Sequence, residues 1–448
     1  MQQVIVLYDF FLFPFYLVIF YLIVRKKATK YAGTPLRKFF LLAFWLHMLG
    51  AIFISFLMQY YYGYGDTFEY YNGGSIIRNM ILKDITNVKY LFYSGKDLAS
   101  AAEALGYGDK IPMQMPGDAN AFVMKLSAVL SFFSFNSFIV ISLFFGFFSF
   151  IGTWKLFYVL KELNGGRHIQ LLGYSAICTP SLWLWGSGLL KEPICIGALG
   201  MAIYIIYKMV VKKQFSLKNL LLLVLLFYII TIVKNYITAI FFVSVLLVLV
   251  MRIFALIKSL VLRAGAMVLF LFVAVVSLMN FNMDNYMNEI VDSSYSQIEN
   301  FKNNYEAVQA DDENSKAGFA IGDIKPTFSS LALHSPQVIA SCLFRPFIWE
   351  SRKVIILFAA LEASFIFLAT LFVLFKTKLL GFFYYVFNNS YRLFCFIFSM
   401  LFALLVGYTT YNFGTMVRYK IIFLPFYFFL LVNMYTTIES REDKLVVK

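Results

Sequence analysis

The chain has 448 residues, of which 61% are hydrophobic and only 14% are charged, whereas soluble domains carry about 25% charged residues. A soluble globular protein is therefore excluded, and we expect an all-α polytopic membrane protein. The formal net charge of +14 does not indicate a nucleic-acid partner, because the basic residues form short clusters between apolar runs, as in cytoplasmic membrane loops. The four cysteines form no CxxC motif, so neither a metal knuckle nor a redox motif is present.

Apolar runs of about 17 to 25 residues predict membrane helices. By this criterion the sequence contains about eleven spans. They are 8–24, 39–58, 137–158, 170–187, 193–210, 219–233, 237–252, 264–281, 353–375, 392–411 and 421–437. The first run has no basic leader and no small-residue cleavage site, so we interpret it as a retained span rather than a signal peptide.

The run 219–251 contains a single charged residue, Lys234, near its middle. As one helix it would be about 50 Å long, and the hydrocarbon core of a bilayer is only about 30 Å thick. We therefore predict a helical hairpin with its tip at Lys234, Asn235 and Tyr236. The arms are short, so the tip should lie at or below the outer surface, where the ammonium group would face a cavity.

The first connection carries six basic residues and no acid: Arg25, Lys26, Lys27, Lys30, Arg37 and Lys38. The positive-inside rule makes this connection cytoplasmic, so the N-terminus should lie outside and the C-terminus in the cytoplasm. The same orientation places later basic clusters, including those at Lys155 and Lys208, on the cytoplasmic side. It also places two long hydrophilic segments, 59–136 and 282–352, outside. We interpret 1–448 as a single membrane domain with these two outer segments.

This topology brings a set of charged residues near helix ends to the outer face: Asp66, Glu69, Lys191, Glu192, Lys234, Arg345, Glu350, Arg352, Arg418 and Lys420. Charged groups at membrane depth are costly unless they pair or line a wet cavity. So many cations on the face where the positive-inside rule expects few favour a phosphate-binding cavity, with Glu192 and Glu350 as supporting acids. For any single cation, the alternative is snorkelling to the lipid headgroups.

Asp66 and Glu69 follow the second span in the stretch YGYGDTFEYYNGG. A carboxylate just outside the bilayer suits a general base that takes a proton from an acceptor hydroxyl, while basic side chains stabilise a phosphate leaving group. Glu69 could bind a divalent cation or orient Asp66, and no other cofactor is indicated. The alternative role is a helix N-cap, because Asp66 and Glu69 also form a capping-box pattern.

Two further titratable residues lie inside predicted spans. His47 would suit an O-acyltransferase, but a single histidine among aromatic residues is more often packed and hydrogen-bonded. Glu362 lies in the middle of the span 353–375, where a charged carboxylate is expensive, so we expect it to be protonated or paired with a polar neighbour. A proton-coupled transporter is the rival explanation for Glu362.

Three motifs carry a family resemblance: an early outer-loop acid in GDTFEYY, a later Lys-Glu pair in SGLLKEP, and a C-terminal RYK before an apolar helix containing Pro425. Together they resemble bacterial GT-C type membrane glycosyltransferases and the related surface-polysaccharide polymerases. The resemblance implies a polyprenyl-phosphate or polyprenyl-diphosphate sugar donor and assigns the base to Asp66. The sequence departs from the family pattern in having two spans before the acidic loop and a D-x-x-E spacing in place of adjacent acids.

We therefore expect a transferase or polymerase that moves a sugar to a glycan or lipid acceptor at the outer face of the bacterial cytoplasmic membrane. One alternative is a transporter or flippase of the lipid-linked glycan. A flippase should show inverted repeats and small outer loops, and the sequence shows neither. The other alternative is a non-catalytic membrane subunit, in which Asp66 would be dispensable.

Overall fold

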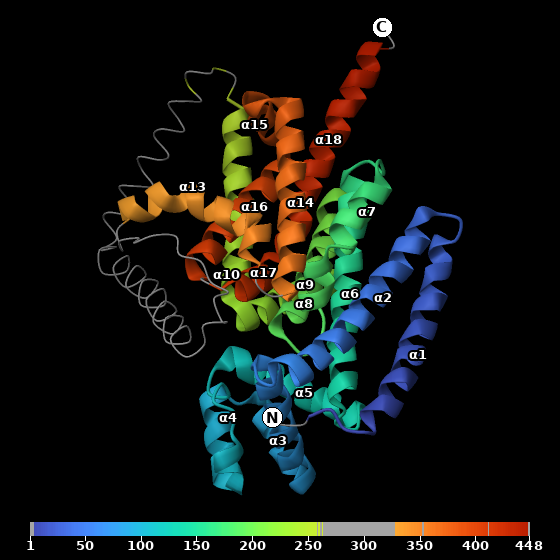
Figure 1. The fold of residues 1–448 in the computed structure, drawn as a ribbon, viewed down its shortest axis with the longest axis vertical. Helices are drawn as coiled ribbons and strands as arrows, with labels where there is room; N and C mark the ends of the chain where they lie inside the picture. The colour runs from blue at the N-terminus through green and yellow to red at the C-terminus, as the bar shows by residue number, and fades with distance from the viewer. Residues whose placement is uncertain are drawn as a thin grey trace. The chain divides into compact units, whose positions relative to one another are not determined.

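The structure, a computed structural model, describes residues 4–257, 259, 262, 328–351, 354–410 and 412–446. The chain divides into two compact units, Met1–Thr238 and Ala239–Lys448, and each unit is treated by itself below. The regular elements of the described residues are all helical, which confirms the all-α class (Figure 1).

Unit 1 contains six longer helices, the first part of a seventh and a set of shorter ones. Its longer elements are α1 (Asp9–Ala28), α2 (Pro35–Phe56), α3 (Asp66–Lys83), α5 (Asp118–Phe133), α6 (Phe138–Leu163), α9 (Lys191–Ile206) and the first part of α10 (Leu217–Ala255). Its shorter elements are η1 (Thr29–Tyr31), η2 (Leu57–Tyr62), η3 (Ile85–Phe92), α4 (Gly95–Ala102), η4 (Glu103–Tyr107), η5 (Gly108–Lys110), α7 (Ile169–Ile177), α8 (Pro180–Trp185) and η6 (Tyr207–Val211).

Unit 2 contains the rest of α10 and the C-terminal helices. These are α13 (Phe328–Phe344), η8 (Ile348–Glu350), α14 (Val354–Thr377), α15 (Leu379–Phe387), α16 (Ser390–Thr409), α17 (Phe413–Lys420) and α18 (Leu424–Val446). α16 packs against α13 and α18, and α14 packs against α13 and α18 as well. Gly407 lets α16 approach α13 closely, since a Cβ there would lie 2.9 Å from the carbonyl oxygen of Val338. Thr370 and Tyr427 join α14 to α18 through a 2.9 Å hydrogen bond between their hydroxyls.

Within the described residues, six helices are long and apolar enough to cross a membrane: Pro35–Tyr62, Phe138–Leu163, Lys191–Val211, Leu217–Ala255, Val354–Thr377 and Ser390–Thr409. The pair Phe413–Lys420 and Leu424–Ser440, bent by 60°, makes seven if it is counted as one span. The structure therefore supports a membrane protein with fewer clear spans than the sequence indicates.

Four differences separate the eleven expected spans from seven, and the first is that the runs 219–233 and 237–252 lie in one element, Leu217–Ala255. The run 170–187 is broken into α7 and α8, because Pro180 starts a new helix after the turn at Cys178, and each piece is too short to cross a bilayer. The run 8–24 forms α1, but this helix has Asp9 in its first turn and three basic residues in its last turn. The run 264–281 lies outside the described residues.

α6 occupies the centre of unit 1 and packs against α1, α2 and α9. Its contact with α9 depends on glycine: a Cβ at Gly152 would lie 2.2 Å from the carbonyl oxygen of Gly197, and a Cβ at Gly200 would lie 2.1 Å from that of Gly152. Small residues let the backbones of membrane helices approach in this way. α6 and α9 are therefore held at a fixed separation by backbone contact.

The predicted hairpin tip coincides with a break in α10. Lys234 leaves the helical region, with φ −151° and ψ 84°, inside an otherwise helical Leu217–Ala255. The hydroxyl of Thr231 donates to the hydroxyl of Thr238 at 3.0 Å, although residues seven apart in a straight helix are separated by about 10 Å along the axis. The chain therefore bends sharply at Lys234, as the mismatch between run length and bilayer thickness predicts.

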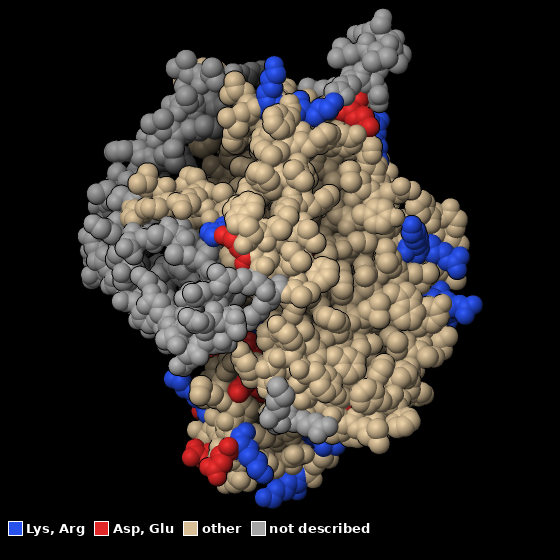
Figure 2. All heavy atoms as spheres, viewed as in Figure 1, with Lys and Arg blue, Asp and Glu red and all other residues tan. Residues whose placement is uncertain are grey.

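The segment between α2 and α6 folds as a small helical layer, with α3 packed against α5. A Cβ at Gly74 would lie 2.6 Å from the Ser127 hydroxyl oxygen, so this glycine sets the spacing between the two helices. Tyr70 adds a 3.1 Å hydrogen bond from its hydroxyl to Asn120 Oδ1. Figure 2 shows charged side chains over α3 and α4 and over the connection between α1 and α2, while the surface of the helices between them is almost free of charge.

Candidate functional site

The two acids after the second span meet one residue that sequence reasoning missed. Asp66 and Glu69 occupy the first turn of α3, and both are half-buried. Gln114 contacts both: its Nε2 donates to Asp66 Oδ1 at 3.1 Å, and its backbone N–H donates to Glu69 Oε2 at 3.4 Å. The loop before α5 therefore covers the start of α3 and holds the two carboxylates next to each other.

Asp66 is not the N-cap residue of α3, because Gly65 occupies that position. Gly65 adopts φ 129° and Gly63 adopts φ 70°, conformations that favour glycine. These two positions turn the chain between η2 and α3. Asp66 therefore sits at the helix N-terminus, where the macrodipole favours a carboxylate.

Lys234, which is predicted from the sequence to face a cavity as a phosphate ligand, forms an ion pair with Glu192. Lys234 Nζ lies 2.6 Å from Glu192 Oε1, and the two side chains are only 6% and 0% exposed. The ring of Tyr236 lies 5.9 Å from the ammonium group. The break in α10 thus delivers a cation to the first turn of α9, where Glu192 and the half-buried Lys191 lie.

The start of α9 lies at the same end of unit 1 as the acid pair. The turn before α9 packs against the last turns of α2: a Cβ at Gly188, whose φ is +81°, would lie 2.3 Å from the Ile54 side chain. α2 continues through η2 to the glycine turn that begins α3. Asp66, Glu69, Lys191, Glu192 and Lys234 therefore share one end of unit 1.

In unit 2, Arg345 and Glu350 form a bidentate ion pair at the end of α13. Arg345 Nε donates to the two carboxylate oxygens at 3.0 and 3.2 Å, and its Nη2 contacts Oε1 as well. The Glu350 carboxylate also accepts the Phe347 N–H at 2.8 Å. The guanidinium lies 5.6 Å from the ring of Phe413 on α17, so the turn that follows α13 is folded onto this helix.

Lys420 is buried at the end of α17, and its ammonium group donates to the Arg345 carbonyl oxygen. It also interacts electrostatically with Glu362, which gives that carboxylate the neighbour that its place in α14 requires. Arg418 is half-buried in the last turn of α17. Arg352 lies outside the described residues. That these unit 2 residues converge with Asp66 stays a prediction.

His47 is packed and hydrogen-bonded, as the simpler interpretation expects. Its Nδ1 lies 2.9 Å from the Ala43 carbonyl oxygen, which can only accept, so Nδ1 carries the proton. Nε2 lies 3.3 Å from the Thr153 hydroxyl on α6, which can then donate to it. The ring is fully buried and joins α2 to α6.

Comparison with models of protein families, with curated proteins and with solved structures finds no match. The candidate site is therefore interpreted from its chemistry alone. Among the described residues, no group of three or more His, Cys, Asp and Glu side chains is arranged to hold a metal ion. The end of unit 1 that carries Asp66 offers an acid pair, a half-buried cation and a compensated ion pair, which suits proton transfer beside an anionic group.

Proposed function

We propose that this protein is a membrane glycosyltransferase or polymerase, which transfers a sugar from a polyprenyl-phosphate or polyprenyl-diphosphate carrier to an acceptor at the outer face of the cytoplasmic membrane. The observation that carries the proposal is the position of the acid pair. Asp66 and Glu69 begin the first helix after the span Pro35–Tyr62, at the end of unit 1 where Lys191 also lies. The expected count of about eleven spans and the outward orientation of this end belong to the same proposal.

In this reaction Asp66 takes the proton from the acceptor hydroxyl, which attacks the anomeric carbon of the donor sugar. The bond from that carbon to the phosphate oxygen breaks, and the carrier leaves as its phosphate or diphosphate. Lys191, at the same end of unit 1, stabilises the leaving phosphate. Gln114 positions Asp66 through its 3.1 Å hydrogen bond to Oδ1.

A transporter of lipid-linked glycan is the second candidate, and the ion pairs favour it. Lys234–Glu192 and Arg345–Glu350 are compensated charges of the kind that mark ion or proton paths in transporters. The two candidates differ in one property: a transferase forms product in detergent, whereas a transporter has no membrane to move its substrate across and forms none.

The test uses the purified full-length protein in detergent with radiolabelled polyprenyl-phosphate and polyprenyl-diphosphate sugars extracted from the native membrane. We expect glycan product from the wild type, and a loss of about 10²- to 10⁴-fold in Asp66→Asn at an unchanged thermal midpoint. Asp109→Asn, an exposed acid of the same segment, is the matched control. Full activity of Asp66→Asn would contradict the assignment of Asp66 as the base. Absence of product from the wild type would contradict the transferase function.

A further inference from the structure

A second site lies near the other end of unit 1, in a cavity of about 220 Å³ between α1, η1, α2 and α6. Phe138, at the start of α6, contacts Tyr71 of α3 with ring centroids 5.4 Å apart. Lys155, which lines the cavity, comes 17 residues later in the same helix, so it lies about 26 Å farther along the axis. That length is close to the thickness of a hydrocarbon core, about 30 Å. The cavity and the acid pair are therefore separate sites.

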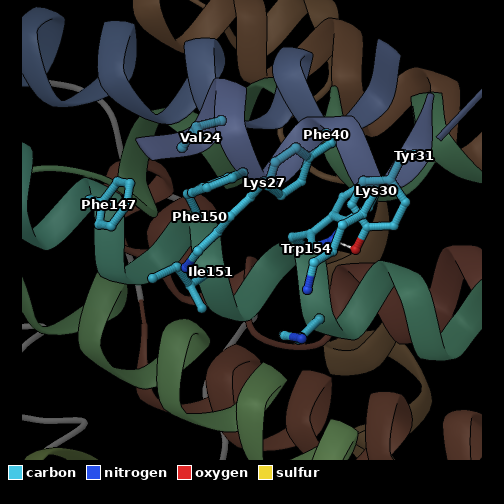
Figure 3. A pocket seen from close by; sticks show the side chains of 10 residues that line it. Val24, Lys27, Lys30, Tyr31, Phe40, Phe147, Phe150, Ile151 and Trp154 are labelled. Atoms are coloured by element: carbon cyan, nitrogen blue, oxygen red, sulfur yellow. Dashed lines mark hydrogen bonds between the residues drawn. The ribbon is translucent and has the colours of Figure 1, made fainter. Parts of the chain in front are cut away.

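The cavity is lined by cations and aromatic rings. Lys27 and Lys30 extend from the end of α1 and from η1 toward α6 (Figure 3). Lys155 of α6 also lines the cavity. The apolar wall includes Phe40 and Trp154. Its aromatic residues are fixed in place: Trp154 Nε1 donates to the Tyr31 hydroxyl at 3.1 Å, and Tyr31 packs edge-on against Trp154 at 5.2 Å.

The lysines of this cavity are not compensated by acids. Among the described residues, none of Lys27, Lys30, Lys155 and the neighbouring Lys208 forms an ion pair, in contrast to Lys234 and Arg345. Lys155 instead lies within electrostatic reach of the other three and over the ring of Tyr204, 4.0 Å from its centroid. Like charges gathered around one hollow repel each other, and a bound anion would relieve that repulsion.

We propose that this cavity binds the phosphate group of an anionic membrane lipid, with Lys27, Lys30 and Lys155 as its ligands. Basic pockets between membrane helices on the cytoplasmic side bind such headgroups. The cavity is larger than the volume of one water molecule, about 30 Å³, and smaller than a typical ligand pocket, about 300 Å³ or more, so its size suits a single headgroup phosphate. The aromatic wall would face the glycerol backbone of the lipid. A soluble phosphate has the same chemistry, and the experiment separates the two sources.

The experiment measures retention of a fluorescent phosphatidylglycerol by the full-length protein in nanodiscs of neutral lipid, with inorganic phosphate as the competing probe. Lys27→Gln, Lys30→Gln and Lys155→Gln should each weaken retention about fivefold, which corresponds to about 1 kcal/mol per lysine near an anionic surface. The triple variant should lose about 100-fold. The same three positions changed to Arg should restore most of the binding, which shows that loss of charge and not of folding is responsible.

The matched control is Lys83→Gln, Lys96→Gln and Lys110→Gln, which removes the same charge from exposed positions outside the cavity. Retention by this control at the wild-type level supports a specific lipid site. If millimolar inorganic phosphate displaces the lipid from the wild type but not from the cavity triple variant, the site exists and its ligand is a soluble phosphate. Equal loss in both triple variants would show that only the net charge acts, and loss in neither would show that the three lysines do not hold the lipid. Either result would overturn the proposal.

Discussion

The buried pair of Lys234 and Glu192 gives the sharpest prediction for stability. At 2.6 Å the gross Coulomb attraction is about 6 kcal/mol for an effective dielectric constant near 20, and the cost of burying both charges offsets most of it. Removing one partner is different, because the other charge is left buried. Lys234→Met, which keeps the length of the side chain, should therefore lower the free energy of unfolding by about 3 to 5 kcal/mol.

The assay is a double-mutant cycle on the protein in detergent, with Lys234→Met, Glu192→Gln and the combined variant followed by thermal and denaturant unfolding. The combined variant should be within about 1 kcal/mol of the wild type, because no uncompensated charge remains. The exposed pair of Lys212 and Glu162, at 3.8 Å with side chains 49% and 24% exposed, is the control and should couple by no more than about 1 kcal/mol. If Lys234→Met lowers the free energy of unfolding by no more than about 1 kcal/mol, Lys234 and Glu192 do not form a buried ion pair.

Two further predictions test the fold of unit 1. Gly152→Ala should lower the free energy of unfolding by about 1 to 3 kcal/mol or more, because its Cβ would lie 2.2 Å from the Gly197 carbonyl oxygen; an unchanged unfolding midpoint would show that α6 and α9 are not in backbone contact. Hydrogen bonds from the Thr86 backbone N–H and side chain lower the pKa of Asp84, the cap of η3, below its usual value of 3.8. The cap should therefore protect the Thr86 amide from exchange above pH 3.8 and lose this effect as the pH falls through the lowered pKa, whereas Asp84→Asn should show no such step.

The long helices are those that the sequence predicts best, because hydropathy over about 20 residues is a strong signal. The break at Lys234 is also predictable, since a run of that length cannot cross a bilayer as one straight helix. The break between α7 and α8 was missed because the residues on both sides of Pro180 are apolar, so the hydropathy of 170–187 is continuous. Proline is the available signal, and it indicates a helix start as well as a kink.

The contacts of the candidate site are much less accessible from the sequence. Gln114 is separated from Asp66 by 48 residues, and nothing in its neighbourhood marks it as polar support for an acid. The same holds for Lys234 and Glu192, which are 42 residues apart. Topology places both members of each pair at one end of a bundle, but only side-chain packing decides which acid meets which cation. The pairing of Arg345 with Glu350, five residues away, is the local exception.

The pairing changes what the individual cations can do. A lysine whose charge is compensated by a buried carboxylate at 2.6 Å attracts a phosphate less than a free lysine does, because the acid repels the incoming anion. Lys191 is half-buried in the first turn of α9, at the end of unit 1 that carries Asp66, so it is the second cation to test as a ligand of the donor phosphate. If the combined variant at Lys234 and Glu192 keeps its affinity for a polyprenyl phosphate while Lys191→Gln loses it, the buried pair holds the bend of α10 against α9 and Lys191 binds the substrate. The opposite result would make Lys234 the ligand and would require the pair to open when the substrate binds.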